Sequence, residues 1–145
     1  MPRKQTRPTC PPEQILEGFS ARVIALANRV RKLLLAMIDG VIEYGMPGWR
    51  LIGFRRRGYF AFIQPMPDHV RLGFEHGAAL PNIGGLLEGD GKQVRFVSIR
   101  SARAAGSRAL KTLISAALFD DDTHGFRRRR AAARTPAPRR HRRAR

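Results

Sequence analysis

The sequence is poor in cysteine and tryptophan, with one of each, and it has no long apolar run. Cys10 has no second cysteine with which to pair, so an internal disulfide and a cysteine metal cage are both excluded, which fits a reducing compartment. The longest uninterrupted apolar stretch, Leu33–Ile38, is far shorter than the ~20 residues of a membrane-spanning helix. No apolar run follows the basic N-terminal residues before Pro11, so we expect no signal peptide. These absences predict a soluble, cytoplasmic protein without a membrane partner.

Acidic residues are absent from both ends of the chain. The formal charge of +17 divides into +3 for residues 1–12, +4 for residues 13–122 and +10 for residues 123–145. With 145 residues, of which 43% are hydrophobic, the chain is long enough for one domain with a core. We therefore predict a flexible basic arm over 1–12, a single domain over 13–122 and a disordered Arg-rich tail over 123–145.

Apolar residues recur at spacings of three and four from Leu16 to Val41, which is typical of a helix. One helix over 13–43 would be about 46 Å long at 1.5 Å per residue. That length is too great for a domain of this size, whose radius of gyration is about 13 Å. We expect a break near Asp39-Gly40, and "YGMPG" (44–48) is predicted to end the helical region.

Alternating apolar residues dominate the next part of the chain and predict strands. Short connections between them favour an antiparallel sheet of about four to five strands, packed against N-terminal and C-terminal helices in a two-layer α+β fold. Ser107 is a plausible N-cap for the last helix. The predicted strands are Trp49–Phe54 and Tyr59–Gln64, joined as a hairpin by the basic tip "RRRG" (55–58), then Val70–Phe74 and Val94–Ile99, with the last helix over Leu110–Leu118.

The stretch "GLLEGDGKQVRF" (85–96) has the glycines and the lysine of a phosphate-binding loop but not the spacing of a P-loop. Leu86 stands where the first glycine is needed, and Gln93 replaces the hydroxyl residue after the lysine. Two acidic residues would also repel a phosphate. We interpret the stretch as a turn in which Gly89 and Gly91 supply positive φ angles.

Metal and catalytic patterns are weak. His69 and Glu75 share a strand face but lie about 20 Å apart along it, too far to share an ion. Asp120–Asp122 would suit a hard cation, although acidic residues after a helix more commonly form a solvated helix end. No serine or cysteine has a recognisable base, so we expect no enzymatic activity.

Arginine clusters are the strongest charge signal. Arg127, Arg128, Arg129 and Arg130 in the tail would neutralise phosphates of a nucleic acid or another polyanion without reading sequence. Arg55, Arg56 and Arg57 at the hairpin tip form a second basic patch. The alternatives are compositional drift of a GC-rich gene for the tail and a solvated turn for the tip.

Three motifs occur in order: "YGMPGW" (44–49), "HVRLGFEHGAAL" (69–80) and "GLLEGDGKQVRFVSIRS" (85–101). With the last helix they resemble the YdhG-like family, also called domain of unknown function 1801, over about residues 15–120. The resemblance implies an antiparallel sheet with flanking helices, compared with frataxin, and no particular reaction. Some relatives are described as intracellular iron chaperones, so iron is a possible ligand by resemblance only. The family positions singled out as a motif loop with possible ligand contacts are Gly45, Pro47, Glu88, Gly89, Gly91, Lys92 and Arg95.

The resemblance favours a non-enzymatic module that handles a small ligand or a metal, with no cofactor implied by the residues themselves. Lys92 and Arg95 would hold an anion or brace Glu88, or Glu88 and Lys92 would only tie the loop to the sheet. Family members often have Thr at Asp90, His at Phe96 and Lys at Ser98, so ligands of that His or Lys are in doubt here. The alternative function is sequence-nonspecific association with nucleic acid through the tail.

Overall fold

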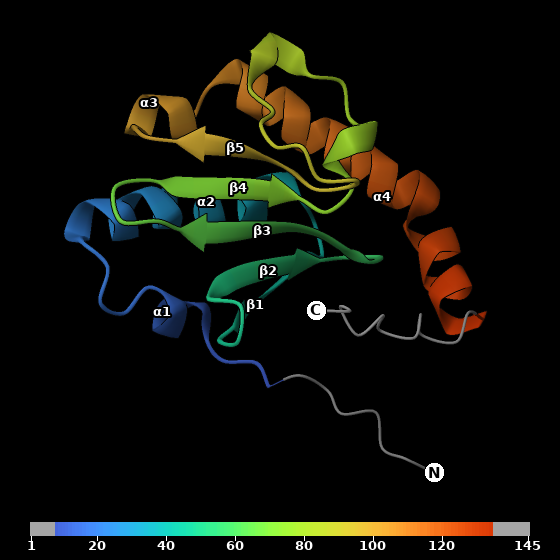
Figure 1. The fold of residues 1–145 in the computed structure, drawn as a ribbon, viewed down its shortest axis with the longest axis horizontal. Coiled ribbons are helices and arrows are strands. Elements are labelled where there is room, and N and C mark those ends of the chain that lie inside the picture. Colours follow the sequence, from blue (N-terminus) through green and yellow to red (C-terminus); the bar gives the residue numbers. More distant parts are fainter. Residues whose placement is uncertain (1–7, 135–145) are drawn as a thin grey trace, which may run out of the picture.

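The computed structural model describes the backbone of residues 8–134 and the side chains of residues 8–124. Five strands, four α-helices and two short 3-10 turns follow one another along this part of the chain (Figure 1). In order they are α1 (Pro12–Ile15), α2 (Ala21–Met37), β1 (Ile42–Met46), β2 (Leu51–Arg55), β3 (Tyr59–Pro65), β4 (Val70–Phe74), η1 (Gly77–Ala79), η2 (Ile83–Gly85), β5 (Arg95–Ile99), α3 (Ala102–Ala105) and α4 (Arg108–Arg134).

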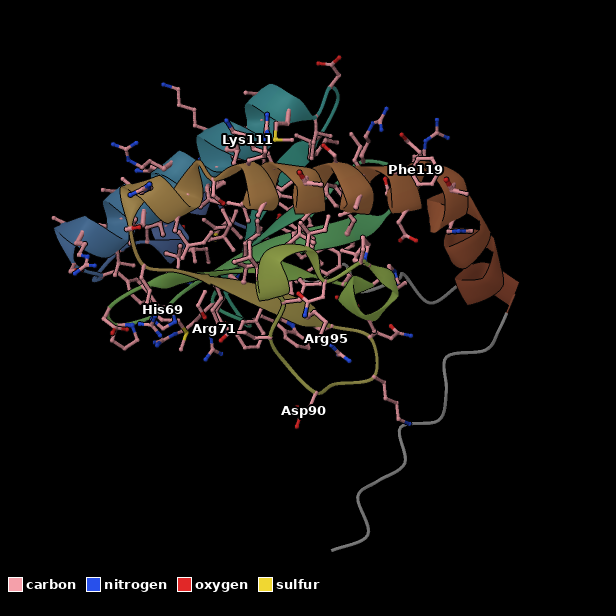
Figure 2. All side chains as sticks on the ribbon, turned by 90° about the horizontal axis from the view of Figure 1, so that it is seen from above. His69, Arg71, Asp90, Arg95, Lys111 and Phe119 are labelled. Atoms are coloured by element: carbon pink, nitrogen blue, oxygen red, sulfur yellow. The ribbon has the colours of Figure 1, made fainter. Side chains whose placement is uncertain are left out.

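The strands form one antiparallel sheet in the order β1-β2-β3-β4-β5, so every strand pairs with its neighbours in sequence. The helices α2 and α4 cover one face of this sheet, and Figure 2 shows them together above it. The predicted two-layer α+β class is therefore confirmed. Among the helices of residues 8–134, none combines the length and apolar character that a membrane crossing requires.

The N-terminal helical region differs from the prediction. A short α1 ends at Ile15, Gly18 takes a left-handed φ of +86°, and α2 begins after it. Ser20 caps α2 by accepting a hydrogen bond from Val23 N at 3.2 Å. The break near Gly40 is confirmed, since its φ is +73°. The apolar spacing therefore reflects a helix only within α2, although it continues past both breaks.

Strand β1 was not predicted, because 44–48 was interpreted as the end of a helical region. Its pairing with β2 places Tyr44 opposite Gly53 and Met46 opposite Leu51. On its other edge Gly45 exchanges two backbone hydrogen bonds with Cys10, at 2.7 and 3.0 Å. The fold therefore begins before the predicted boundary at residue 12.

The C-terminal helix begins as predicted, with Ser107 Oγ accepting from Leu110 N at 3.1 Å. It then continues to Arg134, whereas the sequence placed a disordered tail from residue 123 onward. Alanine and arginine, which fill residues 127–134, have high helix propensities, so the helix has no local reason to stop earlier. Residues 135–145, the rest of the predicted tail, lie outside the described residues.

The core lies between the sheet and its helices. Phe54, Phe74 and Leu34 are buried almost completely, and they belong to β2, β4 and α2. Because one layer covers only one sheet face, the outward residues of all five strands are left to build a surface of their own.

Candidate functional site

One row of paired residues crosses the sheet on the face that the helices leave open. The strand registers place Tyr44 opposite Gly53, Gly53 opposite Phe62, Phe62 opposite Gly73, and Gly73 opposite Phe96. Directly paired residues point to the same side of a sheet. Aromatic residues and glycines therefore alternate along this row, one residue from each strand.

The two glycines of this row give the rings room to lie flat on the sheet. A Cβ atom at Gly73 would lie 2.0 Å from Cζ of Phe62, and one at Gly53 would lie 2.9 Å from Cζ of Tyr44. Real Cβ atoms do not approach other atoms so closely, so any larger residue would push the rings away from the strands. The result is an aromatic floor, which we call the sheet-face floor.

A hollow of about 640 Å³ lies over part of this floor. Its walls come from three strands, the β1–β2 turn and the segments that follow β4 and precede β5. Trp49 stands in that turn with 57% of its surface exposed, which places it at the rim. The lining residues are Met46, Trp49, Leu51, Tyr59, Phe62, Gln64, Glu75 and Val94.

Glu75 carries the only formal charge in the lining of this hollow. It is half-buried, and burial raises the pKa of its carboxyl group above the usual value. No hydrogen bond or ion pair to this carboxylate is found among the described side chains. Burial, with a smaller contribution from Glu75, also raises the pKa of Tyr59. The hollow therefore combines aromatic walls with one uncompensated negative group.

Cations already sit on aromatic rings at both sides of the sheet-face floor. The guanidinium of Arg71 lies 4.4 Å from the ring centre of Phe96, and that of Arg55 lies 5.6 Å from the ring centre of Tyr44. Figure 2 shows Arg71 and His69 on the side of the sheet away from the helices. These contacts demonstrate that rings of this face accept cations.

His69 lies at the start of β4 and is 6% exposed. Its Nδ1 lies 2.6 Å from Asp68 Oδ1, and its buried Nε2 has no hydrogen-bond partner among the described residues. Asp68 is exposed, and its other oxygen accepts from Arg100 at 3.5 Å. We therefore regard this histidine as part of a local turn network beside the floor, not as part of the hollow.

The glycine turn predicted from the sequence lies beside β5. Glu88 exchanges backbone hydrogen bonds with Phe96, and its carboxylate accepts from Ser98 Oγ at 2.6 Å. Arg95 donates to the carbonyl groups of Val94 and Gly91, and among the described interactions no hydrogen bond or ion pair joins its side chain to that of Glu88. Glu88 therefore holds the turn to the sheet, and its partner there is Ser98.

The other positions of the predicted motif loop do not all lie with Glu88 in one site. Lys92 is exposed, and none of the described hydrogen bonds or ion pairs involves its side chain. Gly89 has the predicted positive φ, +113°, but the same prediction is wrong for Gly91, whose φ is not in that range. Gly45 and Pro47 belong to the β1 edge of the sheet, opposite the β5 edge that carries this turn. The family-motif positions thus do not converge on one site.

The basic hairpin tip is held by α4. Arg56 Nη1 and Arg57 Nε contact the same oxygen of Asp122, at 2.6 and 3.2 Å. Asp121 is 3% exposed and accepts the backbone N–H groups of Arg57 and Gly58, both at 3.2 Å. The interpretation of Asp120–Asp122 as a solvated helix end is therefore wrong for Asp121, which fixes the hairpin to the helix layer.

The remaining predicted residues give no second site. Arg127, Arg128, Arg129 and Arg130 lie in α4, but their side chains are outside those described. In the described part of the chain, no three histidine, cysteine, aspartate or glutamate side chains gather as metal ligands would. The iron expectation therefore has no ligand set within residues 8–124.

The hollow was not predicted from the sequence, although the sequence contains a pattern that indicates it. Tyr44, Phe62 and Phe96 alternate in space with Gly53 and Gly73, and all five occupy outward strand positions. Outward aromatic residues paired with outward glycines are unusual for a solvated sheet face. The signal needs the strand register, however, and one of the strands was not recognised.

Comparisons of the chain with models of protein families, with curated proteins and with solved structures gave no significant match. The YdhG-like resemblance consequently stays a prediction based on the quoted motifs.

Proposed function

We propose that this protein is a non-enzymatic, YdhG-like small-ligand module that binds an organic cation in the hollow of its sheet face. The ligand class is an amine or quaternary ammonium group attached to an apolar body. The observation that carries the proposal is the Glu75 carboxylate, half-buried among aromatic rings and without an ion-pair partner among the described side chains. A half-buried charge that is not paired costs stability, and a bound cation would offset that cost.

The chemistry of the walls fits such a ligand. An ammonium group over an aromatic face gains about 0.5–2 kcal/mol, and more as water is excluded. The volume of about 640 Å³ falls within the range of roughly 300–1,000 Å³ that is common for small-molecule sites. Trp49, Tyr59 and Phe62 supply the faces, and Gln64 supplies a neutral hydrogen-bonding group. One carboxylate suits an organic cation better than iron, which takes several such ligands.

Binding is favoured over catalysis by the same lining. Glu75 is its only ionised group, and it contains no serine, cysteine or histidine, so the lining holds no nucleophile–base pair of the Ser–His or Cys–His kind. A cytoplasmic location belongs to this proposal as well, and it rests on the single cysteine.

Trp49, the only tryptophan, makes the proposal directly testable by fluorescence. We expect benzyltrimethylammonium to change its emission in a saturable way, while the neutral isostere neopentylbenzene binds at least about tenfold more weakly. Glu75→Gln should reduce affinity for the cation by about tenfold or more, since it removes a charge–charge attraction of about 4 kcal/mol at about 4 Å and an effective dielectric constant of about 20.

The matched control is Asp90→Asn, which removes an exposed carboxylate from the loop before β5 and should leave affinity unchanged. Equal binding of the cation and its isostere would refute the proposal, as would equal losses in both variants. A parallel Fe²⁺ titration tests the metal version, and tight Fe²⁺ binding that depends on Glu75 would replace the amine by iron.

A further inference from the structure

The helix face of the molecule has a charge pattern opposite to that of the hollow. No acidic residue occurs in α2 or α3, and α4 has none before Asp120. Basic residues are frequent in the same segments, and Figure 2 shows one of them, Lys111, on the helix side of the sheet, opposite Arg71. The outer surface of these segments is therefore mainly basic, and the carboxylates that pair with α2 come from outside them, from Glu13 and Glu43 at Arg31.

A groove of about 300 Å³ lies between α2 on one side and α3 with the start of α4 on the other. Small and aliphatic side chains form its inner part, where Ala105 is 3% exposed and Leu33 is half-buried. Exposed cations stand at its rims, two from α2 and one from α4. We call this feature the basic groove, and its lining consists of Arg29, Lys32, Leu33, Ala36, Ala102, Ala105, Gly106 and Lys111.

The rim cations differ from the other cations of α2. Arg31 is paired with Glu43 at 2.7 Å and with Glu13 at 2.9 Å, and Arg22 donates to the carbonyl group of Arg100. By contrast, the described residues provide no hydrogen bond or ion pair for the side chains at the rim, which are Arg29, Lys32 and Lys111. Their charge is therefore available to a partner.

We propose that the basic groove binds an acidic amphipathic segment of a partner protein. An aliphatic side chain of that segment would enter the apolar part of the groove, while carboxylates on either side would meet the rim cations. Alanine and glycine in the groove let a partner backbone approach closely. This inference is independent of the proposed cation site, because the two features lie on opposite faces of the sheet.

A nucleic acid fits the same groove less well. Phosphates would pair with the rim cations, but the lining offers no aromatic side chain on which a base would stack. The sugar–phosphate chain likewise has no aliphatic side chain to place between Leu33 and Ala105. A leucine flanked by glutamates therefore complements the basic groove better than phosphate alone, because it matches both the apolar inner part and the cations at the rim.

The test is fluorescence anisotropy of the full chain with a labelled helical peptide in which pairs of glutamates alternate with pairs of leucines. Lys32→Glu and Lys111→Glu should each weaken binding by about tenfold at low salt, since each replaces an attraction by a repulsion. Lys92→Glu is the matched control, because it changes net charge equally at an exposed site outside the groove. We expect it to change affinity by less than about twofold.

Three further probes decide the class of partner: a poly-glutamate peptide of equal charge, single-stranded DNA, and vesicles containing phosphatidylglycerol. Weaker binding of poly-glutamate than of the amphipathic peptide supports the apolar contribution of the groove. Equal losses in all three lysine variants would overturn the proposal, because the net charge of the protein, and not the groove, would then account for binding. Tighter, groove-dependent binding of DNA or vesicles would overturn it in favour of those partners.

A second measurement uses the wild-type chain and does not depend on how a variant folds. In amide chemical-shift mapping, the peptide should shift the signals of Ala102, Ala105 and Gly106 and leave those of the sheet-face floor unchanged. Shifts confined to the segment beyond Asp122 would contradict the groove as the binding surface.

Discussion

The two faces of this small domain differ in both charge and shape. The sheet face has a floor of aromatic rings and a hollow whose one carboxylate, Glu75, forms no ion pair with the described side chains. The helix face has a shallow groove of small side chains between cations that have no ion-pair partner in the described part of the chain. A sheet face takes its width from several strands, so rings can lie across it, whereas two neighbouring helices leave a narrow groove between their side chains. The layer that supplies a surface thus determines whether that surface is a broad aromatic hollow or a narrow groove.

The largest expected effect is the loss of stability caused by a substitution in the core that both faces share. Phe54→Ala empties a position of β2 that is 0% exposed, and it should lower the free energy of unfolding by about 3–5 kcal/mol. Urea denaturation followed by circular dichroism measures this loss. Phe119→Ala removes the same side chain at a position that is 73% exposed, and it should cost less than about 0.5 kcal/mol. Similar losses in the two variants would show that the faces do not share this core.

A substitution with an intermediate effect on stability should change ligand binding at the sheet face only. Gly73→Ala places a Cβ atom where the Phe62 ring now lies, so the ring must tilt into the hollow. We expect a loss of about 1–3 kcal/mol in stability, typical of overpacking, together with weaker binding of the organic cation. Peptide binding at the basic groove should not change. Gly91→Ala is the control, since its nearest neighbour would be 3.8 Å away and its φ is not positive.

The smallest expected effect is the dependence of folding stability on pH that Glu75 contributes. Because burial raises the pKa of Glu75 in the folded state, the unfolded chain loses this proton at lower pH than the folded protein does. Stability is therefore lost as pH rises from the unfolded pKa, about 4.5, through the higher folded pKa. Glu75→Gln should raise Tm slightly at pH 7 but not at pH 3. A variant that is less stable at pH 7 would show that the carboxylate has a stabilising partner.

Much of the fold could be predicted from local patterns. The β2–β3 hairpin, β4, β5 and the Ser107 cap follow from alternation, turn residues and capping chemistry within short windows. Strand β1 could not be predicted in this way, because it is a short edge strand whose Gly45 pairs with the distant Cys10. The interruption at Gly18 was hidden by an apolar spacing that continues on either side of it.

The site was less predictable than the fold. Glu75 was considered only as a metal ligand with His69, and its burial among rings depends on residues of other strands. Asp121 resembled an exposed helix end because its two partners are backbone N–H groups more than sixty residues away. The tip arginines were predicted as a basic patch for phosphate, whereas Asp122 lies beside Arg56 and Arg57 in the folded protein.

The sequence by itself determined the class of this protein: one core, an antiparallel sheet with helices, and a surplus of basic charge concentrated near the C-terminus. Those features depend on composition and on contacts between near neighbours in the chain. Only the tertiary structure decided which charges are paired and which rings share a surface. Pairing across five strands and packing of α2 against α3 bring together residues that no short window contains, and these contacts create both the hollow and the basic groove.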